Sequence, residues 1–339
     1  MPQKILIIQT AWLGDNILTT PLVSNAARIG AVDVLTTPKW ASVYEGNPDV
    51  SEILIFDKRG NDKGIFGLRR MAGLLRSKNY DVALIAQRWW RSAILAKMAK
   101  IPKRIGFSNS HAKRLYTGTV EFRSEAHEAE RLLDLLSPLG TNAQRILPKV
   151  FPQKHHMDAA QHLLQQSGWR GERILAIAPA SAWETKRYPY FHDVAEFFAN
   201  QGIFIVTIGA KEDYVLCADL VDKRFSKKTA TFGGEAILTS AALLSISNLL
   251  IANDSGAGHL ASAVQTPVIS IFGPTVPEQG FYPLGEKNKI AQVLLKCRPC
   301  SAHGGKKCPL KHHKCMKSIL PGQIIRMARD YFESPLQNQ

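Results

Sequence analysis

One stretch decides the fold: residues 249–261 read LLIANDSGAGHLA. Its apolar start, Leu249 to Ile251, passes directly into a turn of small and polar residues, which opens a helix with an apolar face. Glycines at 256 and 258 let the backbone approach a ligand closely. The first N–H groups of a helix have no partner within the helix and favour an anion. The stretch therefore predicts a phosphate-binding turn at the end of a buried strand.

Two side chains of this turn, Asp254 and His259, would frame the bound anion. Residues 268–275 (VISIFGPT) read as the next buried strand and a turn, so the order is strand, loop, helix, strand. This order is typical of an α/β sheet that binds ligands in a crevice at its carboxyl edge. The alternative is that Asp254 caps the helix and His259 packs in the core.

The whole chain alternates strands and helices in two halves. With 339 residues and 45% hydrophobic content it can bury two cores. Strands are predicted at residues 4–9, 32–36, 52–56, 81–86, 104–107, 173–178, 203–208, 229–232, 249–252 and 268–272. Helices are predicted at residues 16–29, 65–77, 91–99, 127–136, 157–167, 190–200, 213–223, 238–245 and 258–264. We expect two Rossmann-like, doubly wound α/β domains, residues 1–152 and 153–339, which face each other across a cleft.

Two further polar loops follow predicted strands. Residues 10–15 place Gly14 in a tight turn and Asp15 at a helix start, where it is either an N-cap or a reacting carboxylate. This loop has one glycine where a dinucleotide fingerprint has three, which argues against hydride chemistry. Residues 179–189 offer the hydroxyls of Ser181 and Thr185 and the point charge of Lys186, which suits a diphosphate unless the loop is simply exposed. Together the loops favour transfer of a group from a nucleotide diphosphate to a hydroxyl.

The net charge of +15 is concentrated in two segments. Residues 58–123 contain 16 Lys and Arg but three acidic residues, and residues 296–317 contain seven Lys and Arg and no acid. A basic face typically binds nucleic acid, an anionic membrane leaflet or a phosphorylated substrate. The alternative is that these Lys and Arg side chains are only solvated. No run approaches the ~20 apolar residues that span a bilayer, and the first residues lack a signal peptide, so we expect a cytoplasmic protein.

Four of the five cysteines lie in the second basic segment, at Cys297, Cys300, Cys308 and Cys315. Their spacing permits four thiolates on one zinc ion. It also permits disulfides or reduced thiols in a compact loop. Cys217 lies in a helical pattern and is expected in the core.

Several of these motifs together resemble glycosyltransferase family 9, the ADP-heptose:lipopolysaccharide heptosyltransferases. The resemblance rests on Leu13-Gly14-Asp15 with Thr19-Thr20-Pro21, the Lys186 loop, and residues 254–259 with Phe272-Gly273-Pro274-Thr275. Minor matches are residues 80–83, 104–107 and 297–300. It runs from Lys4 to about Pro321 and looks closest to the heptosyltransferase II branch. It implies a GT-B fold, with a lipid-linked acceptor on the N-terminal domain and ADP-L-glycero-D-manno-heptose on the C-terminal domain.

The resemblance also implies residue roles. Asp15, beside Gly14 at the acceptor site, is the general base that removes the proton from the acceptor hydroxyl. The donor site would comprise Ser181, Thr185, Lys186, Glu212, Asp254, Ser255, Gly256, Gly258 and His259. Within it, Lys186 and the backbone around Ser255 hold the diphosphate, and Glu212 lies near the nucleoside. Transfer would invert the anomeric centre and would require no cofactor; structural zinc on the four cysteines is a separate expectation.

The first basic segment then has an expected partner. This is the Kdo- and heptose-bearing lipid A acceptor at the cytosolic leaflet of the inner membrane, with Arg88, Arg91 and Arg104 as predicted contacts. We therefore expect a cytoplasmic enzyme that is peripheral on the inner membrane. Trp89 and Trp90 would rest at the membrane interface or pack in the core. Nucleic-acid binding would leave the Asp254 turn unused, so no such partner is expected; another GT-B nucleotide-sugar transferase or an epimerase is the nearer alternative.

Overall fold

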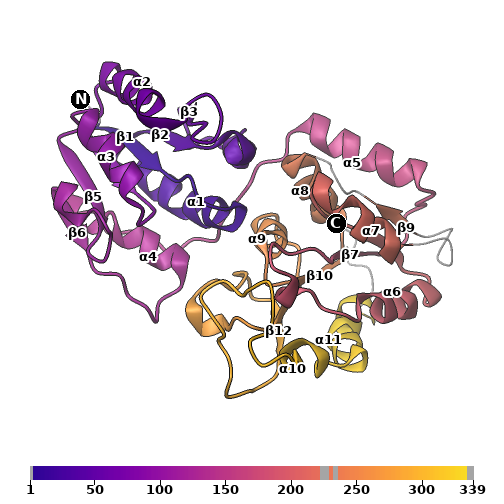
Figure 1. Ribbon diagram of the computed structural model, residues 1–339. Helices are drawn as coiled ribbons and strands as arrows, with labels where there is room; N and C mark the ends of the chain where they lie inside the picture. The colour runs from indigo at the N-terminus through magenta and orange to yellow at the C-terminus, as the bar shows by residue number, and fades with distance from the viewer. Residues whose placement is uncertain (1–2, 222–228, 232–235, 334–339) are drawn as a thin grey trace. The chain divides into compact units, whose positions relative to one another are not determined.

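The computed structural model describes residues 3–221, 229–231 and 236–333. The chain divides into two compact units, Met1–Phe151 and Pro152–Gln339 (Figure 1). Each unit is a twisted parallel sheet with helices packed against it, as the alternation of strands and helices predicted. Among the described helices, none combines the length and the apolar character that crossing a membrane requires.

The first unit holds a six-stranded sheet in the order β3-β2-β1-β4-β5-β6. Its strands are β1 (Gln3–Ile8), β2 (Gly30–Thr36), β3 (Glu52–Ile55), β4 (Val82–Ile85), β5 (Lys103–Phe107) and β6 (Gly118–Val120). Its helices are α1 (Leu13–Ala27), α2 (Gly64–Ser77), α3 (Trp90–Met98) and α4 (Glu128–Asp134), with short η1 (Pro38–Tyr44), η2 (Lys113–Leu115) and η3 (Ser137–Leu139). The strand order reverses between β1 and β4, so the loops after these strands flank the switch point where such sheets bind ligands.

The second unit repeats the design, with the order β12-β11-β10-β7-β8-β9. Its strands are β7 (Ile174–Ala178), β8 (Phe204–Thr207), β9 (Thr229–Thr231), β10 (Leu249–Asn253), β11 (Val268–Phe272) and β12 (Lys289–Gln292). Its helices are α5 (Lys154–Gln166), α6 (Phe191–Asn200), α7 (Tyr214–Leu220), α8 (Ile237–Ile246), α9 (Gly256–Ala263), α10 (Lys314–Lys317) and α11 (Pro321–Glu333), with short η4 (Glu184–Lys186), η5 (Lys211–Asp213) and η7 (Pro277–Gln279). Here the switch point lies between β10 and β7.

Both cores follow from strands that are buried on two faces. In β1, Ile5, Leu6, Ile7 and Ile8 have no exposed surface, which is the continuous apolar run expected of a central parallel strand. In the second unit, Ala178 of β7 pairs with Ala252 of β10. Because the two strands are parallel, the loop that begins at Pro179 and the turn that begins at Asn253 leave the sheet side by side. This register builds the site described below.

Several predicted element boundaries were wrong. Helix α1 begins at Leu13 rather than residue 16, because the carboxylate of Asp15 accepts the Trp12 N–H and closes the first turn earlier. Helix α9 begins at Gly256 rather than residue 258, directly after Ser255 as N-cap. Strands β6 and β12 and helix α11 were not predicted. The predicted ends at residues 223 and 232 lie outside the described residues.

Candidate active site

An ion pair between Lys186 and Asp254 forms the centre of the polar site in the second unit. Lys186 ends η4 in the loop after β7, and Asp254 follows the neighbouring strand β10. Lys186 Nζ lies 2.6 Å from Asp254 Oδ2, and the two side chains are only 12% and 11% exposed. Thr275, in the turn after β11, donates its hydroxyl to the same oxygen at 2.6 Å. Residues that follow three neighbouring strands, β7, β10 and β11, are therefore joined through the carboxylate of Asp254.

Asp254 does not cap helix α9. Ser255 holds the N-cap position and has an extended backbone with φ −155°. The capping alternative for Asp254 is therefore wrong, and its carboxylate serves to hold Lys186. The backbone N–H groups at the start of α9 belong to Gly256 and Ala257, both partly exposed, and a helix start of this kind attracts an anion.

Two other residues of the α9 turn have packing roles. A Cβ at Gly258 would lie 2.8 Å from Pro283 Cγ, so glycine here permits close packing of the helix against the segment before β12. His259 is 5% exposed and lies within α9. His259 is therefore buried, as the packing alternative expected. Contact between His259 and a ligand stays a prediction.

Asn253 connects the turn after β10 with the loop after β7. It is fully buried, accepts the Tyr188 N–H at 2.9 Å and donates to Pro179 O at 2.9 Å. These two bonds hold both ends of the Lys186 loop against β10. The role of Asn253 was not predicted from the sequence, although an amide at the end of an otherwise apolar strand was a usable signal.

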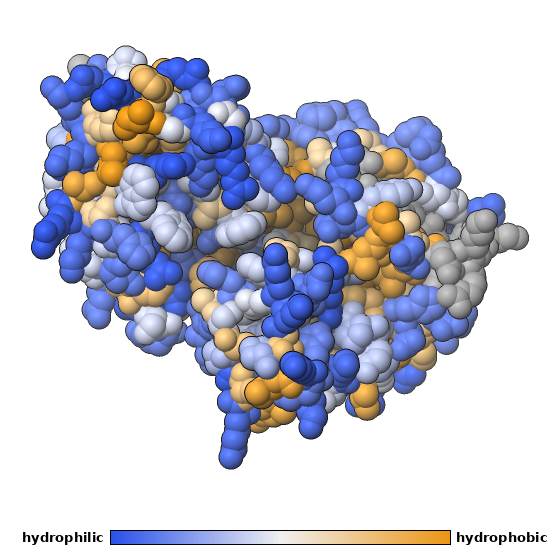
Figure 2. Space-filling view, viewed as in Figure 1, coloured by the Kyte–Doolittle hydropathy of each residue, from blue (hydrophilic) through white to orange (hydrophobic). Residues whose placement is uncertain are grey.

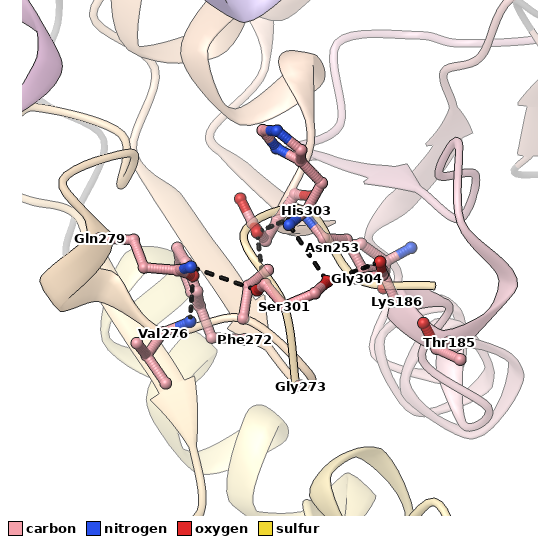
Figure 3. Close-up of polar contacts among 12 residues, drawn as sticks. Thr185, Lys186, Asn253, Phe272, Gly273, Val276, Gln279, Ser301, His303 and Gly304 are labelled. Atoms are coloured by element: carbon pink, nitrogen blue, oxygen red, sulfur yellow. Dashed lines mark hydrogen bonds and ion pairs between the residues drawn. The ribbon is translucent and has the colours of Figure 1, made fainter. Parts of the chain in front are cut away.

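The Cys-rich loop, residues 296–317, forms one wall around Lys186. Thr185 donates its hydroxyl to Gly305 O at 2.6 Å and accepts the Gly305 N–H at 3.1 Å. His313 Nε2 lies 2.7 Å from Thr185 O. Figure 3 shows Gly304 beside Lys186 and Thr185, and a Cβ at Gly304 would lie 3.3 Å from Lys186 Cε. The hydroxyl of Thr185 therefore fixes this loop, and its contact with the donor stays a prediction.

Polar contacts extend this wall toward η7. Ser301 donates its hydroxyl to Gly304 O at 2.8 Å, and Gln279 Nε2 donates to Ser301 O at 3.2 Å (Figure 3). Arg298 donates to Thr275 O at 2.8 Å and to Phe272 O at 3.1 Å. Arg298 therefore braces the turn that carries Thr275 and belongs to the framework of the site.

Two other predicted donor residues lie at the same edge of the sheet. Ser181, partly exposed, follows β7, and its carbonyl accepts from Arg187 Nη2 at 3.5 Å. Glu212 lies in η5, directly after β8, which is the neighbour of β7. The segments that follow β7, β8 and β10 therefore carry all the predicted donor residues, at one edge of the sheet.

In the first unit, Asp15 is the third residue of α1, just after β1. Trp12 holds the N-cap position, so the N-cap alternative for Asp15 is wrong. Trp12 N donates to Asp15 Oδ2 at 3.1 Å, so this carboxylate closes the first turn from within the helix while it stands at the switch point. Burial raises the pKa of Asp15 to about 7, helped by the negative charge of Glu128 and opposed by its bond to Trp12 N and by Arg88. A carboxyl group with a pKa near the working pH is suited to general-base catalysis.

Lys58 lies beside the loop after β1. Its Nζ donates to Thr10 O at 2.8 Å and to Thr10 Oγ1 at 3.0 Å. Gln87, after β4, donates to Thr10 Oγ1 at 2.7 Å, so the loops on both sides of the switch point are joined. Burial and the charges of Arg59 and Arg91 lower the pKa of Lys58. This role of Lys58 was not predicted from the sequence, although Lys58 is the first cation after β3.

Comparison with known proteins assigns the chain to a family. A model of glycosyltransferase family 9 (heptosyltransferase) matches residues 68–313. This chain belongs to that family. It is similar to lipooligosaccharide heptosyltransferase 2 of Campylobacter jejuni, with 25% identity over 340 residues that cover 98% of this chain and 99% of the relative.

Two solved structures share the fold. A family 9 glycosyltransferase from Veillonella parvula matches with a TM-score of 0.87 and 23% identity, over 98% of both chains. The ADP-heptose lipopolysaccharide heptosyltransferase II of E. coli matches with a TM-score of 0.80 and 20% identity, over 97% of this chain and 98% of the other. This family 9 glycosyltransferase therefore has the GT-B fold that the sequence predicted.

The predicted acceptor arginines of the family 9 enzyme occupy different places. Arg88, before α3, and Arg91, in its first turn, follow β4 at the edge that carries Asp15. Arg104 lies near the amino end of β5, where its Nε donates to Leu115 O at 2.8 Å. The structure therefore brings two of the three arginines to the Asp15 edge and places Arg104 at the opposite one. Gly14 is the second residue of α1, beside Asp15.

All five cysteines are free thiols. Cys300, Cys308 and Cys315 line a pocket of about 130 Å³ together with His313. Burial raises the pKa of Cys315 to about 11, whereas backbone N–H groups, that of His313 foremost, lower the pKa of Cys308. Within the described ranges, no group of three or more His, Cys, Asp or Glu side chains is arranged to hold a metal ion. The zinc site stays a prediction, and no catalytic step is derived from it.

Proposed function

We propose that this glycosyltransferase moves L-glycero-D-manno-heptose from ADP-heptose to a hydroxyl of the lipopolysaccharide inner core, with inversion at the anomeric carbon. The observation that carries the proposal is the Lys186–Asp254–Thr275 cluster at the start of α9. It supplies one fixed cation and a helix N-terminus at the carboxyl edge of a GT-B domain, as a nucleotide diphosphate requires. The names of the similar proteins from C. jejuni and E. coli support the choice of heptose.

In the donor half of the reaction, negative charge develops on the departing ADP. Lys186 would neutralise part of this charge, and the N–H groups of Gly256 and Ala257 would donate to the phosphate oxygens. Asp254 is a carboxylate and repels phosphate, so its role is to hold Lys186 Nζ in place together with Thr275. Preorganised charges of this kind usually supply the largest part of the rate enhancement.

In the acceptor half, Asp15 takes the proton of the acceptor hydroxyl. The hydroxyl oxygen then bonds to the anomeric carbon as the bond from that carbon to the ADP oxygen breaks. A single displacement of this kind leaves the new bond on the opposite face of the sugar, which is inversion. The pKa of Asp15, about 7, leaves a large share of the carboxylate ionised at neutral pH.

The acceptor itself is anionic. Kdo carboxylates and lipid A phosphates would meet the cations beside Asp15, namely Lys58, Arg88 and Arg91. A lipid-linked acceptor in the cytosolic leaflet requires a cytoplasmic enzyme that is peripheral on the inner membrane. No nucleic-acid partner is part of this proposal.

A thermal-shift screen of nucleotide sugars tests the proposal. We expect ADP-heptose to raise the unfolding temperature more than ADP-glucose, UDP-glucose or UDP-N-acetylglucosamine at equal concentration. Ligand at 100 times its Kd contributes about 2.7 kcal/mol of stability. Transfer to a Kdo-bearing lipid A acceptor, with the anomeric configuration of the product read by NMR, completes the test. Selective stabilisation by a different nucleotide sugar would overturn the assignment in favour of another GT-B transferase or an epimerase.

A further inference from the structure

The α2–α3 face, formed by the outer sides of α2 and α3, exposes large apolar side chains. On α2, Phe66 is 79% exposed, Ile65 52% and Leu74 44%. At the start of α3, Trp89 is 65% and Trp90 47% exposed, so the core-packing alternative for these tryptophans is wrong. Figure 2 shows hydrophobic residues gathered over α2, with hydrophilic residues around them. Large apolar side chains that are exposed together on one face mark an interaction site.

The same face is cationic. Helices α2 and α3 contain no Asp or Glu, whereas Arg69, Arg76 and Lys97 on these helices are exposed. Trp90, Ile94 and Lys97 follow one another at helical spacing and lie on one side of α3. Arg70 pairs with Asp62 at 2.6 Å, but the guanidinium side chain is still 64% exposed. Positive charge and apolar surface therefore occur together.

A groove on this face combines both properties at close range. It measures about 400 Å³ and is lined by Arg76, Ile94, Lys97, Met98, Lys100 and Leu115. Half of these residues are cations and half are apolar. A cationic rim beside an apolar floor suits a phosphodiester whose hydrocarbon chain lies next to it.

We propose that the α2–α3 face docks on the surface of a bilayer that contains anionic phospholipid. Phe66, Ile65 and Leu74 would enter the interfacial layer, Trp89 and Trp90 would lie at headgroup level, and the cations of the groove would bind lipid phosphates. The inference deepens the proposed function, on which it rests for its lipid-linked acceptor, because it names the surface that meets the membrane.

The charge and composition of the α2–α3 face favour a bilayer over a second copy of this chain or another protein as its partner. A second copy of this chain would present the same cations, so two such faces would repel each other. A protein interface normally has few lysines at its centre, whereas here Lys97 and Lys100 lie within the groove. Exposed aromatic rings next to Lys and Arg are typical of segments that lie at a membrane surface.

Co-flotation of the full chain with lipid vesicles tests the proposal. We expect binding to vesicles of phosphatidylcholine with phosphatidylglycerol, weak binding to phosphatidylcholine alone, and loss of binding at high salt. Each basic residue contributes about fivefold in affinity at an anionic surface. The variant Arg76→Glu/Lys97→Glu/Lys100→Glu should therefore bind about 100-fold more weakly or worse, and Phe66→Ser should bind several-fold more weakly.

The matched control is Arg170→Glu/Lys287→Glu/Arg326→Glu, which reverses three exposed cations of the second unit and should bind nearly as the parent does. All variants should keep the parent unfolding temperature, because the changed side chains are exposed. Equal vesicle binding by the two triple variants would overturn the proposal. Failure of the parent chain to bind anionic vesicles would overturn it as well. Analytical ultracentrifugation tests the alternative of a second copy. If the parent is a dimer and Phe66→Ser is a monomer, the face binds a second copy of the chain instead.

Two activity measurements separate this proposal from the proposed function. Transfer to a deacylated, soluble acceptor should be the same for the parent and the α2–α3 variants, whereas transfer to an acceptor embedded in anionic vesicles should fall with their binding. Failure of the parent to use ADP-heptose with the soluble acceptor would contradict the proposed function alone. Unaltered use of the vesicle-embedded acceptor by the triple variant would contradict the docking face alone.

Discussion

At the scale of single residues, Asp15 is both a structural cap and a titrating group. Its carboxylate closes the first turn of α1 and its pKa is raised to about 7. Replacement Asp15→Asn should lower kcat by about 10²–10⁴-fold, since a positioned base contributes about that much. Affinity for ADP-heptose, measured by calorimetry, should change little. Unaltered turnover in this variant would remove Asp15 from the mechanism.

The same variant should not be less stable than the parent. Because the folded pKa of Asp15 lies above the ordinary value, its protonated form is favoured by folding. That contribution is present below the ordinary carboxyl pKa and is lost as the pH rises through about 7. Asparagine keeps an acceptor for Trp12 N and carries no charge, so its unfolding temperature above neutral pH serves as the folding control.

The pH dependence of the reaction follows from the raised pKa of Asp15. Its base form is lost as the pH falls, so kcat/KM should decline about tenfold per pH unit below about 7. Glu128→Gln removes the negative charge that helps to raise the pKa, while its amide oxygen can still accept from Arg131. The acidic limb of the profile should therefore move to lower pH in this variant. An unmoved limb would show that Glu128 does not act on Asp15.

Lys186 is the proposed cation of the donor half of the site. Lys186→Ala should weaken ADP binding and turnover together, because it removes the cation and leaves the carboxylate of Asp254 facing the diphosphate. The matched variant Arg187→Ala removes an exposed cation one position later in the same loop and should have a small effect. Calorimetric titration with ADP compares the two. Equal affinities for Lys186→Ala and the parent would contradict the assigned role.

At the scale of elements, the Cys-rich loop is held to the Lys186 loop through Thr185. Thr185→Val removes both hydrogen bonds to Gly305 with little change in volume. Each bond contributes about 0.5–1.5 kcal/mol, so ADP should bind several-fold to about 100-fold more weakly if this wall orders Lys186. Thr119→Val, the same replacement at an exposed position of β6 in the first unit, is the comparison. Equal loss in both variants would show that the wall is not the cause.

Element by element, the sequence was most informative where strands are central. The predicted bounds of β11 are those observed, because five consecutive buried residues, apolar except for Ser270, end at a glycine and a proline. The strands β6, of three residues, and β12, of four, lie at sheet edges, and their mixed burial gives no alternation to read. The start of α1 depended on a single hydrogen bond from Trp12 to Asp15, which composition does not show.

The site was predictable to the extent that it follows strand ends. Asp15, Lys186 and Asp254 were identified because each follows a buried strand in the sequence. Asn253 and Lys58 act through tertiary contacts, to Pro179 and to Thr10, which link segments far apart along the chain. The bonds of Thr185 likewise join it to Gly305, 120 residues away, and spacing along the chain does not show them.

At the scale of the whole molecule, the proposed reaction is divided between the two units by charge and by ligand. The first unit would supply the base and the cations that suit an anionic, lipid-linked acceptor, whereas the second would bind ADP at the Lys186 cluster. Hydrogen exchange of the full chain should reveal this division. ADP alone should protect the loop after β7, the start of α9 and the Cys-rich loop, because Lys186, Gly256 and Gly304 lie in these segments.

The loops after β1 and β4 should exchange as before when ADP is added, and a soluble acceptor should protect them instead. The amides of residues 5–8 of β1 and of β10 provide internal references, since these residues are buried in their cores and should exchange slowly in every sample. ADP protection confined to α1 and α3 would place the nucleotide in the first unit. That result would reverse the assignment of donor and acceptor to the two sheets, and with it the roles given to Lys186 and Asp15.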